Sequence, residues 1–141
     1  MSGRAPRTPQ GEASRERLFE AAIGLFAERG YAATGIDAVC RQAGVARTAL
    51  YWHFGSKEEL LAAVIERVGR TWIEEIRKSA YLAADPQERL ERLVQAWQAL
   101  VEEQPHLLRL LLLVQLERSG SSRTTRRALE RVRREAETAL V

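Results

Sequence analysis

Hydrophobic residues recur along this chain at helical spacing, in stretches separated by short segments that carry glycine or proline. In residues 12–30, one face holds Leu18, Ala22, Leu25 and Phe26, at successive spacings of 4, 3 and 1. Such spacing predicts an amphipathic helix. The helix is expected to end at the glycine that closes this range, because glycine readily forms the left-handed cap after a helix.

Two short helices are predicted next, over residues 35–42 and 47–54, on either side of a turn that contains Gly44. Thr34 is expected to cap the first of them by accepting a hydrogen bond from the backbone N–H of Asp37. Two short helices joined by a tight turn with glycine have the layout of a helix-turn-helix.

Further helices are predicted in the second half of the chain. Ser56 with Glu59 forms a capping box, and Asp85 precedes a proline at the first helical position. The predicted helices run over residues 57–80, from 86 to the proline at 105, over 106–118, and from 123 to the end. The segment 106–118 is apolar nearly all round, which is typical of a buried helix.

We find no strand pattern, so the predicted fold class is all-α. An N-terminal three-helix domain with the helix-turn-helix is followed by a C-terminal helical bundle. The expected organisation is a flexible basic arm over residues 1–11, a helix-turn-helix domain over 12–56, and a helical domain over 57–141.

The composition excludes several classes of protein. The chain has 141 residues and one cysteine, so no intramolecular disulfide can form. No apolar signal segment stands at the N-terminus. The longest apolar run, residues 110–114, is far too short to span a bilayer. We therefore expect a cytoplasmic protein without a membrane partner.

The net charge of +3 and the isoelectric point of about 9.5 suggest nucleic acid as a partner. The excess is not where the helix-turn-helix is predicted. Residues 1–60 carry +1, residues 61–118 carry −1, and residues 119–141 carry +3. Net charge alone therefore does not identify a DNA-binding region here.

The helix predicted over residues 47–54 carries side chains suited to DNA. Leu50 and Phe54 lie four residues apart and would anchor it to the core. In a helix-turn-helix the second helix enters the major groove, and its exposed side chains contact base edges and phosphates. Here the exposed face would show Arg47, Thr48, Tyr51 and Trp52. Our hypothesis is that Arg47 reads a guanine.

Several short motifs in this region occur in order and at characteristic spacing. They are Leu25-Phe26, Gly30-Tyr31, Thr34, Ala43-Gly44-Val45, Leu50-Tyr51-Trp52-His53-Phe54 and Ser56-Lys57-Glu58-Glu59-Leu60. Over about residues 14–61 the chain resembles the DNA-binding region of the TetR (tetracycline-repressor) family. The resemblance implies a regulator, most often a ligand-responsive repressor, that binds a palindromic double-stranded DNA operator as a homodimer.

The resemblance also implies roles for single residues. Those matching Thr34 and Gly35 start the first short helix beside a phosphate, and those matching Arg47 and Thr48 reach bases or phosphates. The matches of Tyr51 and His53 contact the DNA backbone, and the match of Lys57 holds a phosphate. Trp52 would lie along the groove wall. The resulting set of DNA-binding candidates is Thr34, Gly35, Arg47, Thr48, Tyr51, Trp52, His53 and Lys57.

Three positions depart from the family pattern. Ala46 stands where serine often caps the recognition helix, Gly35 stands where serine or threonine often touches a phosphate, and Asp37 stands where arginine is frequent. An aspartate there would repel DNA. The departures support an alternative interpretation, a helical protein-interaction module or a regulator fragment that no longer binds operator DNA.

The C-terminal half offers candidates for a ligand pocket, as in the family. An apolar lining would suit a small lipophilic effector, and a plain packed core is the alternative. The candidate lining residues are Trp72, Ile76, Leu93, Trp97, Leu107, Leu110, Leu111 and Val114.

The last helix carries an apolar stripe that needs a partner. It is formed by Leu129, Val132, Ala136 and Leu140. The stripe would pack on its own domain or form a dimer interface. Family members usually continue beyond this point, so we expect either a shortened form of a longer chain or a naturally short member.

An enzyme is the least favoured interpretation. We find no paired carboxylates, no nucleophile–base pair and no phosphate-binding loop, so no catalytic residue is assigned. His53 and Cys40 lack neighbours at metal-ligand spacing, and neither a metal nor another cofactor is expected.

Overall fold

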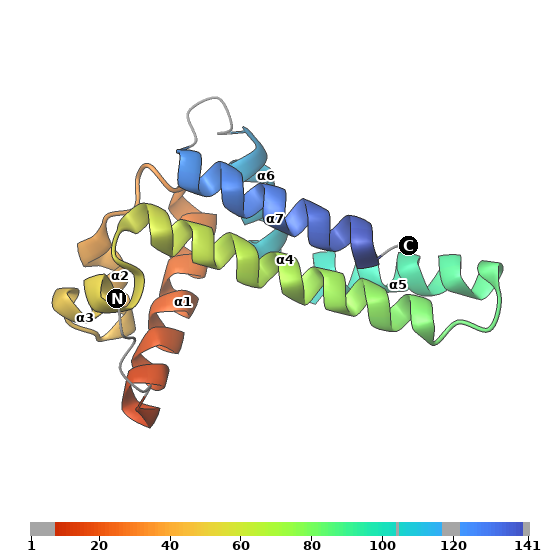
Figure 1. Ribbon diagram of the computed structural model, residues 1–141, viewed down its shortest axis with the longest axis horizontal. Helices are drawn as coiled ribbons and strands as arrows, with labels where there is room; N and C mark the ends of the chain where they lie inside the picture. Colours follow the sequence, from red (N-terminus) through yellow and green to blue (C-terminus); the bar gives the residue numbers. More distant parts are fainter. Residues whose placement is uncertain (1–7, 104, 117–121, 140–141) are drawn as a thin grey trace.

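The computed structural model describes residues 8–103, 105–116 and 122–139, and helices joined by turns make up this part of the chain (Figure 1). No strand occurs among these residues, which confirms the expected all-α class. The helices are α1 (Pro9–Arg29), α2 (Ile36–Ala43), α3 (Arg47–Phe54), α4 (Lys57–Tyr81), α5 (Pro86–Glu103), α6 (Pro105–Leu116) and α7 (Arg123–Ala139).

The N-terminal core forms where α1, α2 and α3 meet the first turns of α4. The side chains predicted for the inner face of α1 are all buried there. Leu50 of α3 and Leu60 of α4 are also fully buried, and the rings of Phe19 and Phe54 pack edge to face with centroids 5.1 Å apart. This core fixes the orientation of α3 on the rest of the domain.

Helix α1 begins earlier than expected, which corrects the predicted limits of the flexible arm. Thr8 is its N-cap, and the Thr8 hydroxyl accepts a hydrogen bond of 3.1 Å from the N–H of Gly11. Pro9 stands at the first helical position, where its missing N–H costs nothing. Residues 9–11 are therefore helical. The remainder of the expected arm, residues 1–7, lies outside the described residues.

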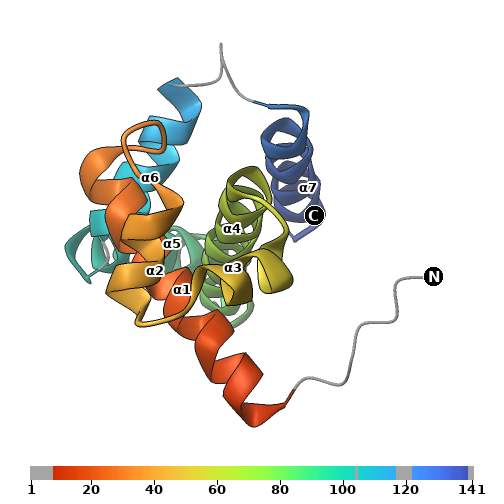
Figure 2. The same ribbon diagram turned by 90° about the vertical axis from the view of Figure 1, so that its left-hand side faces the viewer.

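Helix α4 connects the two halves of the molecule. Ser56 caps it as predicted, by accepting from the N–H of Glu59 at 3.1 Å. Figure 2 shows α4 between α7 on one side and α1 with α6 on the other. No helix in the described residues combines the length and apolar character that crossing a membrane requires.

Helix α7 packs lengthwise along α4. Leu129 and Val132 lie against the core of their own chain, and Ala128 is fully buried. The two helices pack closely at Gly69, where any added Cβ would collide with the side chain of Val132. Ion pairs flank this contact, between Arg131 and Glu66 and between Arg70 and Glu135. The stripe of the last helix thus packs on its own domain.

Helix α5 presents an apolar stripe to solvent. Asp85 accepts from the N–H of Glu88, and Glu88 accepts from the N–H of Ala84, so the predicted cap is present. No residue of α5 is buried. We call its exposed row the α5 stripe: Leu90, Val94, Trp97 and Val101, which are 63%, 49%, 51% and 37% exposed.

Helix α6 packs against α1. Leu110 is buried in the common core, and the Arg109 guanidinium donates to the backbone carbonyl of Glu28 at 3.5 Å. Leu112 is exposed, so the described part of α6 is not buried all round.

Candidate nucleic-acid interface

The turn between α2 and α3 has the geometry of a helix-turn-helix. Gly44 adopts φ 65° and ψ 35°, a left-handed conformation that glycine reaches without steric cost. The N–H of Val45 donates to the carbonyl of Cys40 at 3.0 Å. Val39 and Cys40 are buried on one side of the turn, and Leu50 on the other. The turn therefore holds α2 and α3 in a fixed relation.

One face of α3 is free of the core. Leu50 and Phe54 are buried, while Arg47, Thr48, Tyr51 and Trp52 are exposed, Trp52 to 64%. His53 is half-buried, and its ring stands edge-on to Trp52 at 4.9 Å. The structure thus brings these five predicted DNA-binding residues together on and beside one short helix.

Lys57 opens α4 next to this face. Its ammonium group lies 4.2 Å from the centre of the Tyr31 ring, a cation–π contact. Glu58 and Glu59 follow it in the first turn, where carboxylates are stabilised by the helix dipole. The cation therefore has a defined place at the start of α4.

Arg47 is held by two neighbours at the start of α3. Its Nη1 lies 3.2 Å from Oδ1 and 3.4 Å from Oδ2 of Asp37, and its Nη2 lies 3.4 Å from the Tyr51 hydroxyl. The hydrogen bond to Tyr51 and then the charge of Asp37 raise the pKa of Arg47. The sequence placed Asp37 at the start of a helix and predicted that its charge repels DNA, but it did not predict this ion pair. Nothing in the spacing of the two residues, ten apart, indicated it.

The cap predicted at Thr34 is wrong. Gly35, not Thr34, is the N-cap of α2, and no side chain caps this helix. Thr34 is 0% exposed, and its hydroxyl donates to the carbonyls of Gly30 at 2.7 Å and Leu25 at 3.2 Å. The hydroxyl satisfies carbonyls at the end of α1, so the cap predicted at Thr34 is absent and its contact with a phosphate stays a prediction.

Gly35 and Ala46 leave both helix starts without a side-chain cap. Gly35 is exposed, and no atom lies within 4 Å of where its Cβ would be. Ala46 caps α3 with an extended backbone and no side-chain hydrogen bond. The first N–H groups of α2 and α3 are therefore open to an anion.

The candidate pocket residues have different surroundings. The rings of Trp72 and Trp97 pack edge to face at 5.0 Å, with Ile76 and Leu93 half-buried on the same two helices. Leu110 is buried in the hydrophobic core. The side chains of Leu107, Leu111 and Val114 lie outside the described residues.

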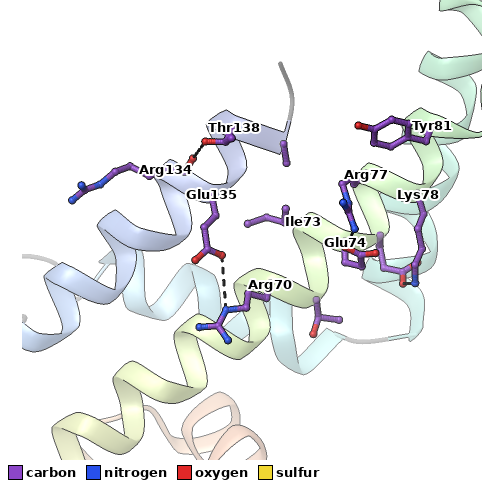
Figure 3. Close-up of a pocket in the computed structure, with 12 residues that line it drawn as sticks. Arg70, Ile73, Glu74, Arg77, Lys78, Tyr81, Arg134, Glu135 and Thr138 are labelled. Atoms are coloured by element: carbon purple, nitrogen blue, oxygen red, sulfur yellow. Dashed lines mark hydrogen bonds and ion pairs between the residues drawn. The ribbon is translucent and has the colours of Figure 1, made fainter.

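A groove of about 960 Å³ lies between the later turns of α4 and α7 (Figure 3). Its walls carry charges of both signs, including Arg70, Lys78, Arg134 and Glu135, together with Ile73 and Tyr81. Among the predicted pocket residues whose side chains the structure describes, none lines it. Most of its lining residues are charged or polar, unlike the apolar set that the sequence suggested.

The candidate dimer stripe is largely occupied within its own chain. Leu129 and Val132 pack on the core as described above, Ala136 is half-buried, and Leu140 lies outside the described residues.

Within the described residues, no three His, Cys, Asp or Glu side chains lie close enough together to hold a metal ion. Cys40 is buried, and burial, followed by the charge of Asp37, raises the pKa of its thiol. A raised pKa makes a thiol less reactive, because the thiolate is the nucleophile.

Comparison with known proteins identifies the N-terminal half. Residues 18–64, which run from α1 into α4, match the family model described as bacterial regulatory proteins of the TetR family. The chain is 35% identical over 108 residues to the HTH-type transcriptional activator FasR of Mycolicibacterium smegmatis. This match covers 77% of the chain but 49% of FasR, so the chain spans about half the length of this relative.

Solved structures share the fold over nearly the whole chain. A TetR-family regulator from Marinobacter aquaeolei superimposes with a TM-score of 0.81 and 24% identity, over 93% of this chain and 66% of that one. The regulator FadR of Bacillus subtilis, solved with stearoyl-CoA, gives a TM-score of 0.73 and 23% identity, over 89% and 66%. These proteins are transcription regulators, not enzymes. Residues 18–64 thus match the TetR family of bacterial regulatory proteins, and the fold of nearly the whole chain is that of a solved TetR-family regulator.

Proposed function

We propose that this protein is a transcription regulator that binds double-stranded DNA sequence-specifically, with α3 in the major groove. The observation that carries the proposal is the division of α3 into two faces. Leu50 and Phe54 fix the helix to the core, and the opposite face presents a guanidinium, a hydroxyl and two aromatic rings. These groups contact base edges and phosphates in known complexes.

The surroundings of α3 fit the two DNA strands that border a major groove. The uncapped start of α2 at Gly35 offers backbone N–H groups to one phosphate. The start of α4, with Lys57, offers a cation and the positive end of a helix dipole to another. Phosphate contacts of this kind fix the register of the protein on DNA.

Replacing Arg47 with alanine tests base reading. We expect affinity for an operator selected from a random duplex library to fall about 5- to 150-fold, with relaxed specificity at one base pair. Fluorescence anisotropy at several salt concentrations measures both. The matched control is Arg133→Ala on α7, an exposed arginine paired within its own helix. A loss of affinity equal for all sequences would assign Arg47 to a phosphate, and a wild-type protein without salt-sensitive DNA binding would refute the proposal.

A homodimer would place two copies of α3 about 34–36 Å apart, in successive major grooves of a palindrome. Because the stripe of α7 is covered, we propose the α5 stripe as the surface that joins the copies. An antiparallel pairing across a two-fold axis would set Leu90 against Val101 and Arg89 against Glu102 of the second copy. Apolar rows would then meet, flanked by opposite charges.

Sedimentation velocity tests this surface. Wild-type protein should have twice the mass of the chain at micromolar concentration, and Val94→Glu should reduce it to the monomer. Gln95→Glu adds the same charge at an exposed position of α5 away from the stripe and should leave the dimer intact. A dimer that survives Val94→Glu would place the interface elsewhere.

We further propose a lipophilic effector bound near Trp72, Ile76, Leu93 and Trp97. Support comes from the apolar character of this half-buried cluster and from stearoyl-CoA in the structure of FadR. In the operator assay, stearoyl-CoA should release DNA while free coenzyme A should not. A reporter placed behind the operator then separates a repressor from an activator such as FasR. A protein that acts on DNA in this way resides in the cytoplasm.

A further inference from the structure

We propose that Asp37 determines the DNA specificity of this protein by holding the Arg47 guanidinium in position to read a base and by keeping it away from phosphates. The inference rests on the proposed function and adds a residue that touches no base itself. Asp37 is thus a positioning residue, and α2 takes part in base reading through it.

The geometry leaves Arg47 restrained but still able to recognise a guanine. Asp37 accepts from Nη1 and Tyr51 accepts from Nη2, and the Arg47 guanidinium lies 5.7 Å from the centre of the Tyr51 ring. A guanidinium has five N–H donors. The contacts of Nη1 with both Asp37 oxygens and of Nη2 with Tyr51 engage two or three of them. At least two donors remain, and reading O6 and N7 of guanine needs two.

The ion pair is placed for recognition and not for stability. The side chains of Arg47 and Asp37 are 58% and 66% exposed, and exposed ion pairs add little to folding. Their value lies in orientation, because a flexible arginine loses conformational entropy when it binds. An arginine already held by Asp37 and Tyr51 has lost part of that freedom before DNA arrives.

Asp37 also changes the charge that a phosphate meets. A bare arginine attracts any phosphate and raises affinity for all DNA alike. With Asp37 at 3.2 Å, the pair is close to neutral at a distance, and its carboxylate repels the backbone. Affinity for random DNA is lowered, while the base contact, made at hydrogen-bond distance, is kept.

Asp37→Asn tests the inference with little change in size. We expect binding to non-operator duplex to become several-fold tighter, and the ratio of operator to non-operator affinity to fall about tenfold. The slope of log affinity against log salt should steepen by about one. The matched control is Glu58→Gln, which removes a first-turn carboxylate from α4 beside the same interface without contacting Arg47. It should leave the ratio unchanged.

A double-variant cycle shows whether Asp37 acts through Arg47. In an Arg47→Ala background, Asp37→Asn should no longer alter discrimination at the base pair assigned to Arg47. A merely structural Asp37 would lower the melting temperature and leave the specificity ratio in place, and that result overturns the inference. If wild-type protein prefers no sequence, the proposed function falls, and the inference with it. If wild-type protein is specific but Asp37→Asn is equally so, the inference alone fails.

Discussion

Replacing Leu50 with alanine is expected to lower the free energy of unfolding by about 2–5 kcal/mol, the largest loss among the changes considered for α3. Leu50 is 0% exposed and, together with Phe54, fixes this short helix to the core. Removing it creates a cavity beneath the exposed face. The free energy of unfolding of a native domain is only about 5–15 kcal/mol, so the variant should be marginally stable.

Urea unfolding followed by circular dichroism measures this loss. Thr48→Ala, on the exposed side of the same helix, is the control and should change stability by no more than about 0.5 kcal/mol. DNA binding should weaken in Leu50→Ala even at temperatures where α1 and α4 remain folded, because α3 is no longer held. If Leu50→Ala cost as little as Thr48→Ala, α3 would not be anchored as described.

The second large effect is expected at Gly69, where alanine should destabilise the protein by about 1–3 kcal/mol. Alanine normally improves a helix by about 1 kcal/mol over glycine, so the sign here is unusual. A Cβ at Gly69 would lie 2.7 Å from Cγ2 and 3.2 Å from Cβ of Val132. Valine is branched at Cβ and has one strongly preferred rotamer in a helix, so its side chain cannot move aside easily.

Two further variants make this prediction specific. Gly24→Ala is the control, because a Cβ there would meet only the Gln42 side chain at 3.9 Å, and it should stabilise α1. Val132→Ala in the Gly69→Ala background should restore much of the lost stability by making room for the new methyl group. Thermal unfolding of the wild type and these three variants measures the changes in stability. Equal stabilisation by Gly24→Ala and Gly69→Ala would contradict the close packing of α4 on α7.

Local signals in the sequence predicted the helices well. Ser56 and Asp85 cap their helices as expected, because a side chain and the N–H three residues on need no tertiary partner. Thr8 followed by Pro9 carried the same kind of signal for α1, and it was overlooked. Thr34 shows where local rules end. By sequence its hydroxyl could bond either to N–H groups of α2 or to carbonyls at the end of α1. In the folded chain it donates to the carbonyls.

Periodicity identified apolar faces but not their partners. The last helix and α5 both carry an apolar stripe, and in the described residues only the stripe of α7 is covered by α4. Gly69 allows the α7 backbone to approach the α4 backbone. A single glycine in a helical pattern does not show which helix packs against it. The same holds for Asp37 and Arg47, which meet only because the turn at Gly44 brings two helices together.

The position of Gly69 gives α4 a mechanical property. The helix has 25 residues and is about 37 Å long, and Gly69 is its middle residue. A rigid α4 that tilted about this contact would move its two ends by equal amounts. A tilt of about 5° would shift each end by roughly 1.5 Å in opposite directions. A displacement of Tyr81 at one end would then produce an equal displacement of Lys57 at the other end, in the opposite direction.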